Sequence, residues 1–142
     1  MAGLPEPVMT VADLAAFFRE AFPGDEGPHD DVVEIRPGWA RLKFEPVARN
    51  LRPGNLVSGP TQMGLADRAA YAVILAHIGP VAMAVTSNLN FSFLRGVQFR
   101  TLHADARLLK LGRRLATVDV QLWQDEEANL VAQSTITYAI PG

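Results

Sequence analysis

The stretch GPTQMGLADRAAYAVILAHIGP, residues 59–80, followed by VAMAVTSNLNFSF, residues 81–93, decides the fold of this chain. Pro60 suits the first position of a helix, because its missing N–H is not needed there. Gly79-Pro80 provides a helix stop. Between these signals the residues are apolar almost all round, which is typical of a buried helix and not of a half-exposed one. We therefore expect a buried helix over residues 60–78.

Residues 81–93 carry the clearest alternation of apolar and polar side chains in the chain. Ser87 is the single interruption of the apolar row, so the pattern predicts one long strand with one apolar face. The row consists of Val81, Met83, Val85, Leu89, Phe91 and Phe93. Three further alternating segments, residues 101–108, 116–123 and 130–140, predict a run of antiparallel strands.

Two shorter elements are predicted upstream of the long helix. An amphipathic helix over about 10–21 begins with an approximate capping box formed by Thr10 and Asp13. Two strands, at about 32–36 and 39–45, follow as a hairpin. The segment between this hairpin and the long helix contains two prolines and a glycine and is expected to be a long irregular loop.

This order of elements favours an α+β fold. An antiparallel sheet with one apolar face needs a covering layer, and the long helix is the candidate for it. We expect an antiparallel sheet wrapped around one long central helix, in a single domain over residues 1–142 with its core at about 32–140. The edge of the long strand would be a liability if left exposed, so we also expect edge-to-edge pairing into a dimer, through the strand near residues 85–91.

The composition limits the kinds of protein that this chain can be. Apolar residues make up 49% and charged residues 20% of the 142 residues, which excludes wholesale disorder. The formal charge of −2 argues against a nucleic-acid partner bound through bulk electrostatics. There is no cysteine, which excludes disulfides, thiolate metal sites and cysteine nucleophiles.

Two further observations concern the location of the protein. The longest apolar tract, residues 65–79, is interrupted by charge and is shorter than the roughly 20 residues that a membrane span needs. The first nine residues have neither a basic nor an apolar signal-peptide region. We therefore expect a cytoplasmic protein with no membrane partner.

Asp67 is the residue that the chain itself singles out for chemistry. It lies inside the predicted buried helix among small and apolar residues, although aspartate is seldom buried without a partner. The adjacent Arg68 does not share its face of the helix. Asp67 is a candidate functional carboxylate. The plainer interpretation places it on a solvated stripe, or has it capping a neighbouring backbone group.

Ser58-Gly59-Pro60 brings a glycine to the start of the same helix. The first N–H groups of a helix lack partners and lie at the positive end of its dipole, which suits a developing oxyanion. Many helices begin in this way without a function. Asp67 follows Gly59 by eight residues, slightly more than two turns, so its side chain could lie along the face below the helix start.

Six of the thirteen basic residues fall in one segment, which predicts either a phosphate-binding surface or a solvated strand face. They are Arg95, Arg100, Arg107, Lys110, Arg113 and Arg114, with Asp105 the one acidic residue among them. No pair of histidines has metal-ligand spacing, and no Ser-His-Asp arrangement can be assembled. We expect no metal and no cofactor.

From residue 57 to Asp67, and along the strand that follows, the chain resembles the hotdog-fold thioesterases of the phenylacetate-degradation (PaaI-like) group. The signature of that group is His-Gly-Gly with Asp or Glu nine residues after the His. Here Ser58 stands at the His position, Gly59 and Pro60 at the glycines, and Asp67 at the acid. The resemblance covers roughly residues 32–140 and implies the hotdog fold.

The resemblance also implies roles for individual residues. In that family the acid acts as nucleophile or general base toward an acyl-CoA thioester, and a glycine N–H at the helix start polarises the carbonyl. These roles fall to Asp67 and Gly59, with Ser58 beside them. Thr86 matches a Ser or Thr that positions water or substrate. The family often has Asn or Gln six residues before the His, where this chain has Arg52.

Further substrate-binding candidates are Asn50 and Asn55, which lie near residue 52, and Arg95 and Arg113, which are the first candidates for the CoA phosphates. Two functions remain open at this point. One is an acyl-CoA thioesterase, and the alternative is a non-catalytic acyl-CoA-binding hotdog module. In either case we expect a homodimer or a dimer of dimers, with Asp67 of one chain facing residues of the other.

Overall fold

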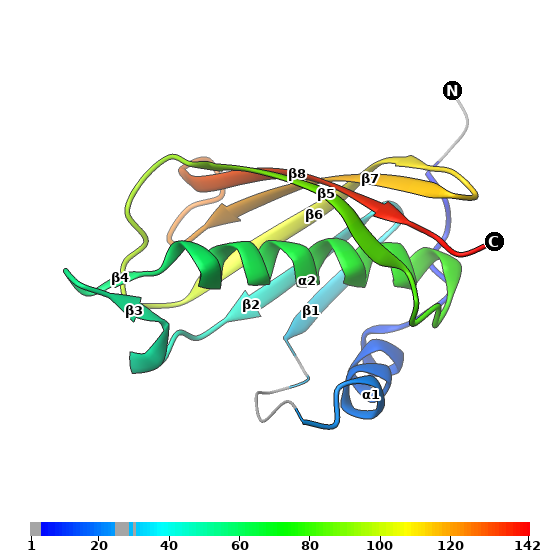
Figure 1. Ribbon diagram of the computed structural model, residues 1–142, viewed down its shortest axis with the longest axis horizontal. Coiled ribbons are helices and arrows are strands. Elements are labelled where there is room, and N and C mark those ends of the chain that lie inside the picture. Colours follow the sequence, from blue (N-terminus) through cyan, green and yellow to red (C-terminus); the bar gives the residue numbers. More distant parts are fainter. Residues whose placement is uncertain (1–3, 25–28, 30) are drawn as a thin grey trace.

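The computed structural model describes residues 4–24, 29 and 31–142; residues 1–3 of the N-terminal stretch considered above lie outside this part. A long helix, α2 (Gly59–Ile78), lies along one face of a six-stranded antiparallel sheet (Figure 1). Across the sheet the strands are β1 (Val32–Arg36), β2 (Trp39–Phe44), β6 (Leu102–Leu111), β7 (Leu115–Trp123), β8 (Leu130–Ala139) and β5 (Val85–Phe93). The predicted α+β hotdog fold is confirmed.

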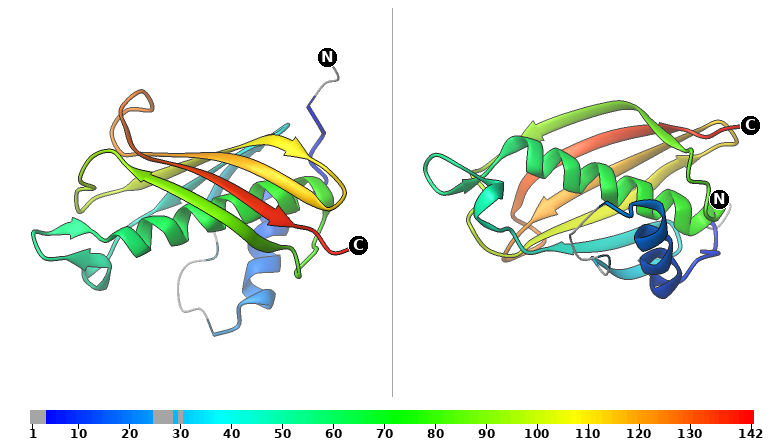
Figure 2. Two further views of the ribbon diagram at one scale, coloured as in Figure 1. Left: turned by 45° about the horizontal axis from the view of Figure 1, so that its top comes forward. Right: turned by 60° about the horizontal axis from the view of Figure 1, so that its bottom comes forward.

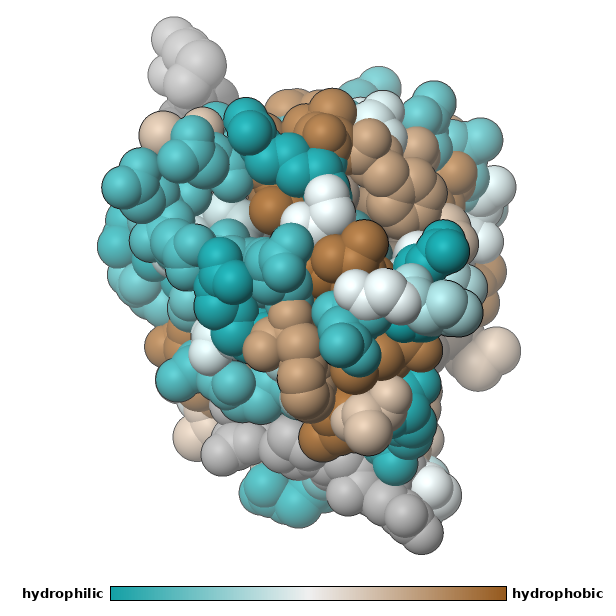
Figure 3. Space-filling view, turned by 90° about the vertical axis from the view of Figure 1, so that its left-hand side faces the viewer, coloured by the Kyte–Doolittle hydropathy of each residue, from teal (hydrophilic) through white to brown (hydrophobic). Residues whose placement is uncertain are grey.

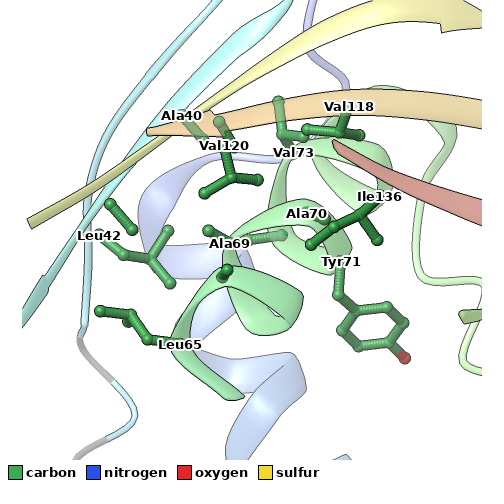
Figure 4. Packing of buried hydrophobic residues seen from close by; sticks show 14 of the residues in the cluster. Ala40, Leu42, Leu65, Ala69, Ala70, Tyr71, Val73, Val118, Val120 and Ile136 are labelled. Atoms are coloured by element: carbon green, nitrogen blue, oxygen red, sulfur yellow. The ribbon is translucent and has the colours of Figure 1, made fainter. Parts of the chain in front are cut away.

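The helix α2 is buried over most of its surface, as its composition predicts. Twelve of its 20 residues are buried, and the helix packs against one face of the sheet. Ala69 and Ala70 let the helix approach the sheet closely, where Val118 and Ile136 lie over it (Figure 4). Each fully buried Val or Ile contributes about 1.5–3 kcal/mol relative to an exposed one, so this contact fixes the position of α2.

A second helix, α1 (Val11–Ala21), lies beside β1 and α2 (Figure 2). Its predicted capping box is present: the Thr10 hydroxyl accepts from Asp13 N at 3.1 Å, and the Asp13 carboxylate accepts from Thr10 N at 2.9 Å. Leu14 and Phe18 are buried on the inner side of α1. The C-terminus of α1 is therefore held close to the middle of α2.

The long strand differs from its prediction in two respects. It begins at Val85 and not at residue 81, because Gly79 adopts φ 96° and the chain then turns, with Ala84 N donating to the carbonyl of Val81 at 3.1 Å. A β-bulge at Ser87 also shifts the register against β8. The predicted apolar row is therefore wrong at Met83 and Val85, which are 71% and 51% exposed.

The bulge at Ser87 changes which side chains of β5 face the helix. Thr86 pairs with Tyr138, and Leu89 pairs with Ile136, both on the buried side of β8. Thr86 consequently shares the helix side of the sheet with Leu89 and the two phenylalanines that follow. A bulge often redirects a side chain next to a functional site in this way.

The segment before α2, predicted to be irregular, contains a short 3₁₀ helix η1 (Ala48–Asn50) and a two-stranded hairpin, β3 (Leu51–Arg52) and β4 (Leu56–Val57). Backbone hydrogen bonds of 2.8 Å join Ser58 N to the carbonyl of Asn50, and Val57 N to that of Val97. The start of α2 is thereby tied to the segment that follows β5. No helix within the described residues is long and apolar enough to cross a membrane.

Candidate active site

The Asp67 carboxylate is held by two hydroxyl groups. Thr86 Oγ1 donates to Asp67 Oδ1 at 2.7 Å, and the Tyr138 hydroxyl donates to the same oxygen at 2.8 Å. The Tyr138 hydroxyl also lies 3.1 Å from the Asp67 carbonyl oxygen. Within the described residues Oδ2 accepts no hydrogen bond. One carboxylate oxygen is thus oriented, and the other is available for chemistry.

Three elements place these side chains together: Asp67 on α2, Thr86 on β5 and Tyr138 on β8. Tyr138 is 3% exposed. Burial raises its pKa, and the Asp67 carboxylate raises it further, while the hydrogen bond with Thr86 acts in the opposite direction. The net shift is upward, so Tyr138 keeps its proton and remains a donor to Asp67 near neutral pH.

Tyr138 is a candidate site residue that the sequence prediction missed. It belongs to the buried row of β8, in which it alternates with outward-facing threonines. A tyrosine hydroxyl at the end of a buried row, which also contains Ser134, was the available signal. It could be interpreted only once the pairing of β8 with β5 placed Tyr138 opposite Thr86.

A hollow of about 650 Å³ opens beside Asp67, and we call it the Asp67 hollow. Its lining is mostly aromatic and aliphatic. It consists of Phe22, Gly64, Asp67, Arg68, Tyr71, Ala82, Ala84, Val85, Thr86 and Tyr138. The guanidinium of Arg68 donates to Asp31 at 2.5 and 3.2 Å and lies over the Phe18 ring at 4.2 Å.

The start of α2 is built by Ser58 and Gly59. Ser58 is the N-cap: its Oγ accepts from Thr61 N at 3.3 Å and lies 2.8 Å from Thr61 Oγ1. Gly59 N–H has no acceptor among the described residues. A Cβ at Gly59 would lie 3.2 Å from the Phe93 ring, so the close approach of β5 favours glycine here. Ser58 therefore supports the helix start, while Gly59 offers a free N–H.

A second hollow, of about 480 Å³, lies at this helix start and is called the Gly59 hollow. Its lining consists of Arg52, Leu56, Val57, Gly59, Gln62, Phe93, Leu94, Arg95, Gly96 and Val97. Figure 3 views the molecule from this end and shows hydrophobic surface, in brown, between hydrophilic areas in teal. The hollow combines exposed apolar side chains, Phe93 and Leu94 among them, with two arginines.

The structure brings some of the predicted substrate-binding residues to Gly59 and leaves others elsewhere. Arg52 and Arg95 both line the Gly59 hollow, and their Nε atoms donate to the carbonyls of Pro53 and Leu130. Asn50 instead accepts from Val47 N at 2.8 Å. Asn55 has φ 58° in the turn between β3 and β4. Neither asparagine lines the Asp67 hollow or the Gly59 hollow.

The basic cluster predicted over residues 95–114 does not form one surface. Arg113 lies in the turn between β6 and β7, whereas Arg95 lies near Leu130 at the other end of β7. Nine strand residues separate these ends, a length of about 30 Å at 3.3 Å per residue. Arg100 is paired with Asp125 at 2.6 Å, and Arg107 faces a hollow on the outer side of the sheet.

Asp67 and Gly59 are also separated within the chain. They are eight residues apart on one helix, which corresponds to about 12 Å at a rise of 1.5 Å per residue. A carbonyl group that accepts from Gly59 N–H therefore lies beyond the reach of the Asp67 carboxylate of the same chain. No group of three potential metal-ligating side chains occurs among the described residues.

Comparisons with known proteins add the family. The profile of the Thioesterase superfamily matches residues 54–131. A structure assigned as a thioesterase from Silicibacter sp. TM1040 is 40% identical, with 96% of this chain and 95% of that chain covered and a TM-score of 0.85.

Two further similar structures carry more specific names. A mutant of the phenylacetic acid degradation protein PaaI from Thermus thermophilus is 28% identical, with 78% of this chain and 91% of that chain covered and a TM-score of 0.67. A Streptococcus mutans UA159 protein bound to acetyl CoA is 26% identical, with 79% and 88% covered and a TM-score of 0.68.

Proposed function

Because the chain belongs to the thioesterase superfamily, as a hotdog thioester hydrolase of the PaaI type, we propose that it hydrolyses acyl-CoA thioesters with Asp67 as its catalytic carboxylate. Water adds to the thioester carbonyl carbon, the carbon–sulfur bond breaks, and the products are a carboxylic acid and the CoA thiol. The observation that carries this proposal is the orientation of the Asp67 carboxylate: Oδ1 accepts two hydrogen bonds, and Oδ2 accepts none from the described residues.

The chemistry needs an attacking oxygen and a donor for the developing oxyanion. Asp67 Oδ2 either attacks the carbonyl carbon or takes the proton of the water that attacks it. Thr86 and Tyr138 are positioning residues, because their hydroxyls hold Oδ1 and leave Oδ2 turned to the substrate. This arrangement favours an enzyme over the alternative of a binding module, which has no use for an oriented carboxylate.

Gly59 N–H supplies the oxyanion donor, and it comes from a second copy of the chain. The separation of about 12 Å along α2 prevents one protomer from offering both groups to one carbonyl. Each active site therefore combines Asp67 of one protomer with Gly59 of its partner. Two identical sites arise in a two-fold dimer, as the symmetry of an isologous interface requires.

The free edge of β5 provides the dimer contact. Within the described residues β5 pairs only with β8, so its other edge carries unpaired backbone groups, and such edges favour pairing with another chain. Residues paired across antiparallel strands share a face of the sheet. We place the two-fold axis at Asn90, because in this register Phe93 of one chain lies opposite the partner's Ser87, next to the partner's Thr86. Since Phe93 packs on Gly59, this register brings Gly59 toward the partner subunit's Asp67.

The CoA moiety fits the Gly59 hollow. Arg52 and Arg95 line it, and guanidinium groups bind phosphates through paired hydrogen bonds. Arg113 lies at the Asp67 end of the sheet, so in the dimer it approaches the same composite site as the partner's Arg95. The acetyl CoA bound by the similar Streptococcus mutans protein supports this class of substrate.

The test is release of CoA thiol by the purified protein across short, long and aromatic acyl-CoA substrates. Hydrolysis of at least one of them, lost in the Asp67→Asn variant, supports the proposal. Tight binding of acyl-CoA without turnover of any substrate would instead assign the binding module.

A further inference from the structure

We propose that the Asp67 hollow receives the acyl group of the thioester, and that Phe22 at the end of α1 limits the length of acyl chain that it accepts. The inference rests on the proposed thioesterase activity. It concerns a helix that lies outside residues 54–131, the part matched by the family profile.

A row of aromatic rings leads from the catalytic carboxylate to α1. The Tyr138 hydroxyl donates to Asp67, and the Tyr138 ring stacks on Tyr71 with centroids 5.9 Å apart. Phe22 in turn meets Tyr71 edge-on, with centroids 6.3 Å apart. All of these residues line the Asp67 hollow. An acyl chain whose carbonyl lies at Asp67 can therefore extend along this row toward Phe22.

The two ends of this row differ in how firmly they are held. Tyr71 is 8% exposed, and its hydroxyl donates to the carbonyl of Ala82 at 3.0 Å, which fixes its ring as a wall. In Figure 4 the ring extends from α2 away from Leu42 and Leu65. Phe22, by contrast, is 41% exposed and directly follows the last residue of α1. Phe22 is therefore the residue that closes the outer end.

Small residues keep space open nearer the carboxylate. A Cβ built on Gly64 meets nothing within 4 Å, and Ala82 and Ala84 face the same hollow. The basic group in the lining, Arg68, is engaged by Asp31 and by the Phe18 ring. An apolar acyl group thus suits the Asp67 hollow, whereas the two arginines of the Gly59 hollow suit the phosphates. The difference between the two hollows therefore decides how the substrate is oriented, with its acyl group in the Asp67 hollow and its phosphates in the Gly59 hollow.

The experiment measures kcat/KM for straight-chain substrates from acetyl-CoA to dodecanoyl-CoA. Each methylene buried in an apolar site contributes about 0.8 kcal/mol, or about fourfold in kcat/KM. For the wild-type protein we expect this rise to stop at the chain length that reaches Phe22. In Phe22→Ala the rise should continue, so that the ratio of dodecanoyl-CoA to hexanoyl-CoA hydrolysis increases by at least about tenfold. Phe22→Trp should move the limit to shorter chains.

Phe17→Ala is the matched control. Phe17 lies on the same helix and meets the same Tyr71 ring, with centroids 6.3 Å apart, but it does not line the Asp67 hollow. It should leave the ratio at its wild-type value. A wild-type ratio in both Phe22→Ala and Phe22→Trp would overturn this inference while hydrolysis itself upheld the proposed function. Absence of hydrolysis with every substrate would overturn the proposed function instead.

Discussion

Replacing Asp67 by asparagine should reduce kcat by about 10²–10⁴, the usual contribution of a general acid–base group. Asparagine has the shape of aspartate, and its amide oxygen can accept the hydrogen bonds of 2.7 and 2.8 Å from Thr86 and Tyr138. The amide nitrogen then occupies the position of Oδ2, where it can neither take a proton nor attack a carbonyl. The fold should survive, because both hydrogen bonds persist.

The assay follows release of CoA thiol at saturating substrate, with thermal unfolding recorded on the same preparations. Asp119→Asn is the matched control, since Asp119 accepts from Gln121 at 3.2 Å and Gln133 at 2.7 Å on the outer face of the sheet. It should keep the wild-type kcat. A folded Asp67→Asn variant that hydrolyses its best substrate at the wild-type rate would refute the assignment of Asp67.

Three further predictions concern the surroundings of the site. Tyr138→Phe and Thr86→Val each remove one donor to Asp67 and should lower kcat by about tenfold to a hundredfold with little change in KM, because a hydrogen bond to a charged group contributes about 1.5–3 kcal/mol. Arg52→Ala and Arg95→Ala should raise KM for acyl-CoA several-fold at nearly constant kcat, but should leave KM for the same acyl group on N-acetylcysteamine unchanged, since that substrate carries no phosphate. Burial raises the pKa of Tyr138 above its ordinary 10.0. The stability that its neutral hydroxyl contributes is therefore present below pH 10.0 and is lost as the pH rises through the folded-state pKa. In urea titrations the wild type should lose more stability above pH 10.0 than Tyr138→Phe does.

The fold could be predicted because its two decisive signals are local. A helix that is apolar all round and strands that alternate with period two are both visible in a single sequence. The start of β5 was harder to predict, because the turn after Gly79 continues the same alternation of apolar and polar residues. The bulge at Ser87 was also hidden, since it is defined by pairing with β8.

The site could be predicted where its residues stand close together in the chain. Ser58, Gly59 and Asp67 belong to one helix and its cap, and their placement on it follows from the sequence. Tyr138 could not be found without the strand order. Arg95 and Arg113 appear close together in the sequence, but the long hairpin of β6 and β7 sends them to opposite ends of the sheet. Residues far apart in the sequence, Asp67 and Tyr138, thus lie in contact, whereas residues close in the sequence, Arg95 and Arg113, lie far apart.

The measurement that tests the composite site most directly is complementation between two inactive variants. Asp67→Asn removes the carboxylate, and Gly59→Pro removes the N–H at the first helical position, where proline fits the backbone and the exposed Phe93 ring has to shift by only a few tenths of an ångström. Each variant alone should be inactive. After the two are unfolded together and refolded, about half of the two-fold dimers are mixed, and each mixed dimer holds one site with both wild-type residues. The mixture should recover about a quarter of the wild-type activity. A mixture as inactive as its parts would contradict an active site shared between subunits.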